Sequence, residues 1–450
     1  MLRSNNWRQE TRALLKLAGP LIVNNLSIAL MHTADAVMAG QLGAESLAAV
    51  AVGGSVWFFG FSICLGLLMA ISPIAARHYG SGNPEMIGRY TRQGMYLGIF
   101  VAIILMVIAF RFVGPALDTI GIDAEFRGLT TGYVHAIVWG APAIFVFLAL
   151  RFTTEGIGAT RPIMYVSVLS LIVNVFLNWV LMFGHFGAPA LGAIGCGYAS
   201  AITMWLMMIA LTVYMIWDPK YRSLRIFSRV APVRPEVLKE ILILGVPIAI
   251  TITAEAGLFN AVSVLMGTRG ASIAAAHQVA ISFAMTMFMV PLALSSAITI
   301  RVGHALGAGN PQAARFSGGL GIVVCGLFMC CSAAFMLFFR DAIISFYTND
   351  PSVTSIAVSL LMMAAIFQIA DGVQVGSAGA LRGYKDTRIP MAISAFAYWA
   401  LAFPLAYMAA VTYKAPPSYT WGAFIVGLSV AAVLLAWRYV RLSRARLAEI

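Results

Sequence analysis

Three carboxylic acids lie inside long apolar segments of this sequence: Asp35, Glu255 and Asp371. The other acidic residues fall in polar stretches between such segments or at the chain ends. An ionised carboxylate at the centre of a bilayer costs at least about 2.5–3.5 kcal/mol. No lysine or arginine shares these three segments as a partner. Each acid is therefore a candidate reversible site for H⁺ or Na⁺.

Glu255 stands near the middle of its segment, residues 241–268, and Thr251 lies one helical turn before it. The threonine hydroxyl would either hydrogen-bond the acid or add an oxygen ligand for a small cation. The alternative is a permanently protonated glutamic acid that joins two helices. The central depth of Glu255 favours the ion-binding role.

Asp371 has Gln368 and Gln374 three residues away on either side, so the three side chains share one helix face. A polar stripe of this kind favours a lined cavity over a lipid-facing surface. If Na⁺ is the ion, Glu255 and Asp371 are the expected carboxylate ligands.

Asp35 lies close to the end of its segment, so an acid that reaches the membrane surface is the alternative to a buried one. An acid near a helix C-terminus is disfavoured by the helix dipole. Asn24, 11 residues earlier, lies on nearly the same helix face, and His32, at i−3, is an expected hydrogen-bond partner. These neighbours favour a functional role for Asp35.

Two further pairs of polar residues fall in apolar segments. Asn174 and Asn178, at i and i+4, serve either as a helix–helix contact or as part of a polar pocket. His277 and Gln278 are pocket candidates too, although ordinary hydrogen-bonded helix contacts are the simpler interpretation.

The elements that must position these residues are membrane helices. The chain has 450 residues, 61% hydrophobic and 10% charged, whereas soluble domains have roughly 25% charged residues. A helix needs about 20 apolar residues to cross a bilayer, and twelve segments qualify: 17–39, 48–76, 93–110, 128–150, 162–184, 186–217, 241–268, 270–300, 316–339, 351–381, 389–413 and 415–437. The sequence predicts an all-α integral membrane protein with twelve transmembrane helices.

Lysine and arginine are distributed unevenly over the connections. If the amino terminus is cytoplasmic, the inside connections and tails hold 24 of them and the outside connections hold 5. This asymmetry predicts that both termini are cytoplasmic, and it accounts for the net charge of +12 without a nucleic-acid partner. The five cysteines lie in or beside apolar segments, so neither a disulfide framework nor a metal site is expected from them.

An internal repeat divides the chain. Eight glycine, proline and asparagine positions recur 227 residues later, and the clearest copy is GSGNP at 80–84 against GAGNP at 307–311. We therefore expect two pseudo-symmetric six-helix bundles, residues 1–222 and 223–450, inserted in the same orientation. Parallel repeats commonly hold substrate between them and alternate access. A duplicated channel or receptor is also compatible with the repeat.

Motifs for ATP hydrolysis and common hydrolases are absent from the sequence. There is no GK dipeptide and hence no P-loop, and HExxH and GxSxG are missing too. The three buried acids lie on separate segments, which argues against an intramembrane enzyme. We expect a non-enzymatic protein without a cofactor, driven by an ion gradient if it pumps.

The joint pattern resembles the multidrug and toxic compound extrusion (MATE) family, and its bacterial NorM-like branch in particular. The resemblance covers essentially the whole chain. It rests on twelve spans, duplicated GxGNP connections and the stretches HTADAVMAGQLG, TAEAGLFNAVSVLMG and FQIADGVQVGSAGALRG. It implies two six-helix bundles around a central cavity. It also implies efflux of mostly cationic, amphipathic drugs in exchange for Na⁺ or H⁺, which confers drug resistance.

The resemblance also implies roles for particular residues. The branch's essential acids match Asp35, Glu255 and Asp371, and its asparagine pair matches Asn174 and Asn178. Phe367 stands where some relatives have a tyrosine, so one hydroxyl of a Na⁺ ligand set is lost.

Two other functions compete with drug efflux. A lipid-linked oligosaccharide flippase of the same superfamily would need cations in its cavity for a pyrophosphate, and no lysine or arginine lies within the predicted spans. A channel, another carrier or a scaffold would show no coupled drug movement. The expected partners are cationic small molecules and membrane lipid, with no nucleic acid, for a monomer in a bacterial inner membrane.

Overall fold

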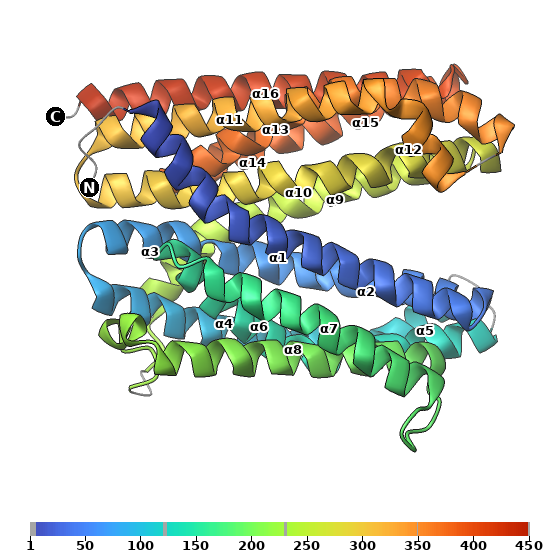
Figure 1. Ribbon diagram of the computed structural model, residues 1–450, viewed down its shortest axis with the longest axis horizontal. Helices are drawn as coiled ribbons and strands as arrows, with labels where there is room; N and C mark the ends of the chain where they lie inside the picture. The colour runs from blue at the N-terminus through green and yellow to red at the C-terminus, as the bar shows by residue number, and fades with distance from the viewer. Residues whose placement is uncertain (1–5, 120–123, 229–231, 349, 449–450) are drawn as a thin grey trace. The chain divides into compact units, whose positions relative to one another are not determined.

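The computed structural model describes residues 6–119, 124–228, 232–348 and 350–448, and every regular element in these residues is helical (Figure 1). Within this described part, twelve helical stretches are long and apolar enough to cross a membrane. The prediction of an all-α protein with twelve membrane helices is confirmed.

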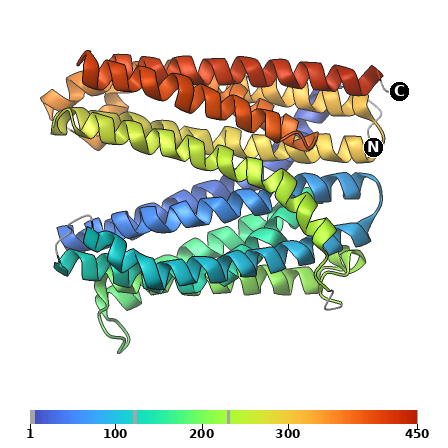
Figure 2. The same cartoon turned by 180° about the vertical axis from the view of Figure 1, so that it is seen from behind.

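Packing divides the chain into two compact units. The N unit comprises Val23–Tyr79 and Asn83–Ala249, and the C unit comprises α1 as far as Ile22, Gly80–Gly82 and the chain from Ile250 onward. The sequence halves 1–222 and 223–450 therefore differ from the packing units. Each of two helices, α1 (Trp7–Gln41) and α9 (Pro235–Gly267), begins in one unit and ends in the other. Figure 2 shows α9 as one continuous helix.

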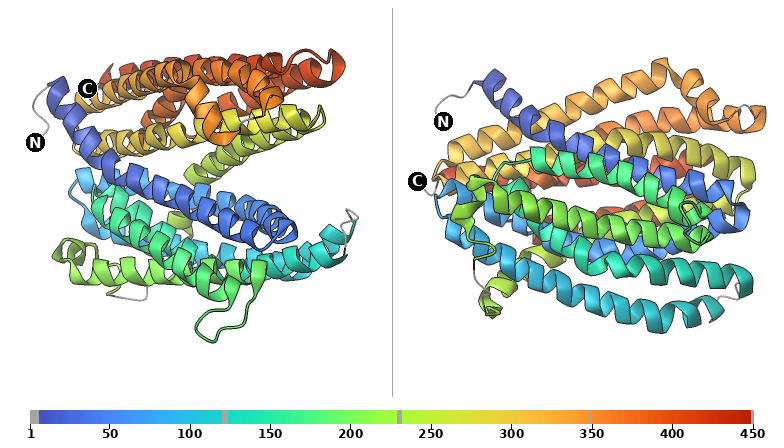
Figure 3. Two further views of the ribbon diagram at one scale, coloured as in Figure 1. Left: turned by 45° about the vertical axis from the view of Figure 1, so that its right-hand side comes forward. Right: turned by 60° about the horizontal axis from the view of Figure 1, so that its bottom comes forward.

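The N unit contains the second half of α1, the first half of α9 and the elements between them. These are α2 (Ala44–Met69), α3 (Ile71–Gly80), α4 (Pro84–Thr119), α5 (Ala124–Ile137), η1 (Val138–Gly140), α6 (Ala141–Gly156), α7 (Arg161–Phe183), α8 (Gly192–Trp217) and η2 (Pro219–Leu224). Helix α8 packs against α5, α6 and α7, and α4 packs against α6. The connection between α7 and α8 projects beyond their ends (Figure 3). It occupies residues that the sequence pattern assigned to a span starting at 186, because apolar residues continue through its turn.

The C unit contains the first half of α1, the second half of α9 and seven further helices. These are α10 (Ala271–Gly307), α11 (Pro311–Phe338), α12 (Arg340–Tyr347), α13 (Pro351–Gly383), α14 (Arg388–Ala395), α15 (Phe403–Tyr407) and α16 (Pro417–Ala448), with the π-helical segments η3 (Phe396–Ala402) and η4 (Met408–Thr412) on either side of α15. Helix α13 is the centre of this unit, since it packs against α10, α11 and α16. It carries Asp371.

The sequence repeat reflects matched backbone geometry. Gly43 and Gly270 precede α2 and α10 with φ of 115° and 123°, and Gly82 and Gly309 both have φ of 70°. A residue with a Cβ is strained at such angles, so the same turn requires glycine in both copies. The repeated glycines thus mark matching turns between helices in the two copies of the repeat.

Candidate functional site

Asp371 and Glu255 belong to the same unit and interact electrostatically. Asp371 on α13 is 4% exposed, and its Oδ1 has no hydrogen-bond partner among the described residues. Glu255 on α9 is half-buried. A buried carboxylate oxygen without a donor is costly unless it is protonated or holds a cation.

Gln374 extends this polar cluster by one helical turn. Its Nε2 donates to the Tyr398 hydroxyl at 2.9 Å, while its Oε1, like Oδ1 of Asp371, lacks a partner in the described part of the chain. Tyr398 is fully buried and lies on η3, a π-helical segment of the kind often found at functional sites. The arrangement leaves two buried oxygens without donors among the described residues, one of a carboxyl group and one of an amide, on one face of α13.

Gln368, the other member of the predicted stripe, has complete hydrogen bonds. Its Oε1 accepts from Ser332 at 2.8 Å, and its Nε2 donates to the Ala284 carbonyl at 3.4 Å. The side chain therefore joins α13 to α10 and α11. Phe367 is 2% exposed and packs edge-on against Phe259, Trp421 and Phe424 in the apolar core.

The polar residues of α10 are placed differently from one another. His277 is 2% exposed, with one ring nitrogen 3.0 Å from the Ser263 hydroxyl and the other accepting from Trp421 at 3.2 Å. This is a structural histidine between α9, α10 and α16. Gln278 is exposed and donates to Ser282, one turn along α10. Thr251 lies on α9, one turn before Glu255, and is half-buried.

Asp35 is the centre of a second polar cluster, in the N unit. It is 6% exposed, and Asn178 Nδ2 donates to its Oδ1 at 2.6 Å and to Asn174 Oδ1 at 3.2 Å. Cys196 on α8 is a further hydrogen-bonding neighbour. His32, expected from its spacing to be the partner of Asp35, is exposed, and the hydrogen bond comes from α7 instead.

Asn24 lies apart from this cluster. Three helical turns separate it from Asp35, about 16 Å along α1. With its amide oxygen turned toward α6, fully buried Asn24 accepts from Arg151 Nη2 at 3.2 Å. Arg151 Nε also donates to buried Glu155 at 2.7 Å. Sharing a helix face with Asp35 therefore does not bring Asn24 into the same site.

Several arginines that lie outside the predicted spans are inside the helices of the structure. Arg151, Arg301 and Arg382 each stand one residue beyond a predicted end at 150, 300 or 381, whereas the helices continue to Gly156, Gly307 and Gly383. Arg382 Nη2 donates to Ser295 Oγ at 2.6 Å, and this guanidinium attracts Glu255 electrostatically. These helices therefore extend beyond the apolar runs that define the predicted spans, and the extensions carry arginines.

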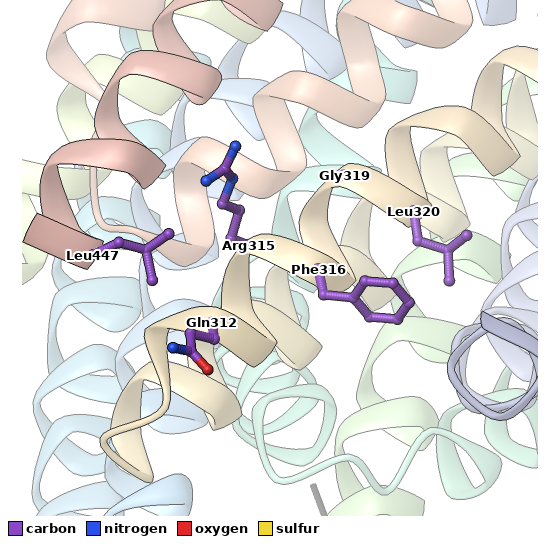
Figure 4. A pocket seen from close by; sticks show the side chains of 6 residues that line it. All are labelled: Gln312, Arg315, Phe316, Gly319, Leu320 and Leu447. Atoms are coloured by element: carbon purple, nitrogen blue, oxygen red, sulfur yellow. The ribbon is translucent and has the colours of Figure 1, made fainter. Parts of the chain in front are cut away.

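No three His, Cys, Asp or Glu side chains of the described residues gather where they would hold a metal ion. A Na⁺ ion bound by Glu255 and Asp371 would therefore need neutral oxygens as further ligands. Gln374 Oε1 and the Thr251 hydroxyl have the right chemistry. A pocket of about 430 Å³ lies elsewhere in the C unit and contains none of the predicted site residues (Figure 4). It is lined by Gln312, Arg315, Phe316, Gly319, Leu320 and Leu447.

A family model described as MatE matches the chain twice, at residues 20–180 and 247–408. The two matches begin 227 residues apart, which is the interval of the sequence repeat. Three similar curated proteins are the multidrug resistance proteins PmpM of Pseudomonas aeruginosa, NorM of Aliivibrio fischeri and MdtK of Photorhabdus laumondii. Their identities to this chain are 36%, 37% and 38%, over 97%, 98% and 95% of it and 92%, 96% and 95% of their own lengths.

Solved structures of transporters share the fold. The crystal structure of the eukaryotic MATE transporter AtDTX14 superposes with a TM-score of 0.87 at 24% identity, covering 98% of each chain. An outward-facing multidrug resistance MATE family transporter superposes with a TM-score of 0.90 at 18% identity, covering 99% of this chain and 98% of its own.

Proposed function

Because the chain belongs to the MatE family of membrane transporters, we propose that it is a cation-coupled multidrug efflux antiporter. It exports amphipathic, mostly cationic organic compounds by alternating access. The single observation that carries the coupling proposal is the buried Asp371, whose Oδ1 has no donor among the described residues. The names of the relatives, all multidrug resistance proteins, support the substrate class.

Glu255 and Asp371 form the proposed cation-coupling site in the C unit. A cation, H⁺ or Na⁺, binds these carboxylates from outside and neutralises charge that would otherwise hold a cationic drug. The drug leaves outward, and the ion-loaded protein returns to its inward-facing state. The membrane potential contributes about 2.3 kcal/mol per charge per 100 mV.

Arg382 adjusts the charge balance of this proposed site. Its attraction to Glu255 offsets part of one negative charge, whereas Asp371 feels Glu255 as a like charge and forms no ion pair within the described part of the chain. Like-charged carboxylates favour uptake of one cation between them. In this proposal Asp371 is the principal ion-binding group and Glu255 assists it.

Asp35, Asn174 and Asn178 form a proposed second polar site in the N unit, for drug or proton. Asn178 holds the carboxylate, while Asn174 Nδ2 and Asn178 Oδ1 lack partners in the described residues and are free to hydrogen-bond a ligand. We place Asn24 outside this site, because it contacts Arg151.

We propose a bacterial inner-membrane location for a monomer with both termini cytoplasmic. The 24 to 5 distribution of lysine and arginine supports this orientation. The even number of spans agrees with it, since α1 begins and α16 ends on the same side of the C unit (Figure 1).

The flippase alternative is weakened by the partners of three half-buried arginines. Arg151 is paired with Glu155, Arg301 with Glu10, and Arg382 attracts Glu255. A pyrophosphate would have to displace these acids from the cations. The acid-rich C-unit cluster suits a cationic compound better.

The decisive experiment measures efflux of a fluorescent organic cation from proteoliposomes under separately imposed Na⁺ and pH gradients. Asp371→Asn and Glu255→Gln are expected to abolish gradient-driven export, and Glu236→Gln, an exposed acid on the same α9, is the matched control. Unmodified export by both site variants would refute the coupling site. Ion conductance without drug movement would support a channel, and lipid-linked oligosaccharide transfer would support the flippase.

A further inference from the structure

Two half-helices are exchanged between the packing units: residues 7–22 of α1 belong to the C unit, and residues 235–249 of α9 belong to the N unit. Their apolar packing follows the repeat. Gly245 lies so close to Leu67 that a Cβ would meet the Leu67 carbonyl oxygen at 2.4 Å. Ala18 and Leu294, the residues 227 positions away from this pair, belong to one core cluster. Apolar contact of this kind does not by itself fix a helix against sliding.

Glu10 ties the first exchanged half-helix to its host unit. Its side chain accepts from Arg301 Nε at 2.8 Å and Nη2 at 2.5 Å, and from the Ser317 hydroxyl at 2.6 Å. Glu10 is 8% exposed, and Ser317 is 1% exposed. Both carboxylate oxygens are occupied by donors, in contrast to Asp371, so Glu10 is arranged for holding a position and not for taking up an ion.

Glu240 makes the corresponding contact for the second exchanged half-helix. It is half-buried and accepts a hydrogen bond from the hydroxyl of Tyr90, on α4. Three residues along α4, fully buried Gln93 donates to the Pro232 carbonyl and accepts from the Arg234 N–H, both at 2.9 Å. These two side chains of α4 hold the start of α9 on the N unit.

The hydroxyl donors of the two contacts occupy equivalent positions of the repeat. Tyr90 and Ser317 are 227 residues apart, so the hydroxyl donor stands at the same place in both copies although the residue type differs. The acids themselves are displaced by three residues, since the counterpart of Glu10 is Val237 and not Glu240. Three residues are close to one helical turn, which keeps both carboxylates on equivalent helix faces.

We propose that Tyr90 and Ser317 are matched anchoring positions that fix the exchanged half-helices on their host units throughout the transport cycle. Glu10, Arg301 and Glu240 complete the anchors as positioning residues and do not contact the transported compound. The anchored segments move with their hosts, so any change of angle within α1 and α9 falls near the unit boundaries at residues 22 and 249. This proposal does not depend on which ion is coupled or which residues bind it.

The test measures the distance between two spin labels in the C unit by pulsed electron paramagnetic resonance. Arg12→Cys on α1 and Gln312→Cys on α11 are both exposed positions, and the exposed native Cys330 and Cys331 are replaced by serine. The anchored protein should give one narrow distance distribution that is the same at high pH, at low pH and with Na⁺. Glu10→Gln should broaden it, whereas Arg8→Gln, an exposed charge change on the same half-helix, should not.

Charge reversal separates a specific anchor from a general effect on folding. Glu10→Arg and Arg301→Glu alone should each lower efflux about tenfold, and the double variant should restore it to within about threefold, because the ion pair is rebuilt in reverse. Ser317→Ala, which removes one donor and keeps the ion pair, provides a milder variant that should still broaden the distance distribution. Tyr90→Phe should likewise broaden the distance distribution between spin labels at Asn83→Cys and Lys239→Cys, both in the N unit.

An unchanged narrow distribution in Glu10→Gln and Ser317→Ala would overturn the proposal. Lost efflux with an unchanged distribution would overturn it too, since Glu10 would then act in transport directly. The Asp371 variant tests only the proposed coupling site, and the spin-label distances test only the proposed anchors. Either proposal can therefore be refuted without the other.

Discussion

The side chains of the predicted polar stripe on α13 differ in whether their hydrogen bonds are complete. Gln368 is satisfied by α10 and α11, whereas Asp371 Oδ1 and Gln374 Oε1 lack donors in the described residues. Spacing along one helix predicts that the three share a face, and it cannot tell which are satisfied, because the partners come from distant segments. Buried acceptors without donors call for a ligand, a proton or an ion.

Tyr398 is expected to set the orientation of Gln374. Tyr398→Phe removes the acceptor of Gln374 Nε2, so the Gln374 side chain loses the hydrogen bond that fixes its orientation. Removing a group that hydrogen-bonds and orients an ion ligand typically lowers the ion affinity 10–100-fold. We expect the coupling-ion concentration at half-maximal transport to rise about tenfold, with the maximal rate within about twofold. Transport titrations measure this. Tyr407→Phe, at an exposed site of the same span, is the control, and an unchanged titration would contradict the assignment.

The two asparagines of α7 should differ in importance. Asn178 donates directly to the Asp35 carboxylate at 2.6 Å, whereas Asn174 only accepts from Asn178 at 3.2 Å. Hydrogen bonds to charged groups are worth about 1.5–3 kcal/mol, so Asn178→Ala should reduce efflux about tenfold and Asn174→Ala only about twofold. Dye efflux in cells at matched expression gives the ranking. A reversed order would mean that Asn174 contacts substrate itself.

Helix ends are the feature of the elements that sequence predicts least well. The run of apolar residues stops at the first arginine, but backbone hydrogen bonding continues, so the apolar pattern leaves Arg151, Arg301 and Arg382 outside the predicted spans. An arginine can lie inside a helix where an acid or a hydroxyl from a neighbouring helix receives its hydrogen bonds, as Glu10 does for Arg301. Those partners are far apart in sequence, and a single segment gives no sign of them.

The start of α13 offers a pH test at the scale of one element. Asp350 accepts from the Ser352 hydroxyl and N–H, and the Ser352 hydroxyl is the main cause that lowers the pKa of Asp350 below its ordinary 3.8. The stabilisation is therefore full above the unfolded pKa and is lost as the pH falls through the lowered folded value. Asp350→Ala should lower the unfolding temperature at neutral pH, with the difference vanishing in acid.

Asparagine caps a helix without titrating, so Asp350→Asn should keep the unfolding temperature near the original at neutral pH. Fluorescence-detected unfolding in detergent at several pH values compares the original protein with the two variants. If the unfolding temperature of Asp350→Ala stays below that of the original protein even at the lowest pH, the carboxylate charge is not what stabilises this end of α13.

At the scale of the whole molecule, the sequence predicts the repeat but does not predict the exchange of half-helices between the units. Glycines at 43, 82, 270 and 309 recur because the same turns need positive φ in both copies, and sequence carries that signal directly. Which unit holds residues 7–22 depends on contacts such as Glu10 with Arg301, 291 residues apart. Such pairings arise only when the helices pack together.

The exchange predicts how the chain behaves when it is cut. A break in the connection at residues 229–231 leaves a carboxy-terminal fragment without residues 7–22, whose Leu14 and Ala18 fill a core cluster of the C unit. Burying side chains of this size contributes several kcal/mol in total. Either fragment alone should aggregate in size-exclusion chromatography, whereas co-expressed fragments should assemble and export drug. A monodisperse carboxy-terminal fragment, as heat-stable as the intact chain, would mean that the exchanged half-helix contributes little to its host, and Glu10 would then have no anchoring role to explain.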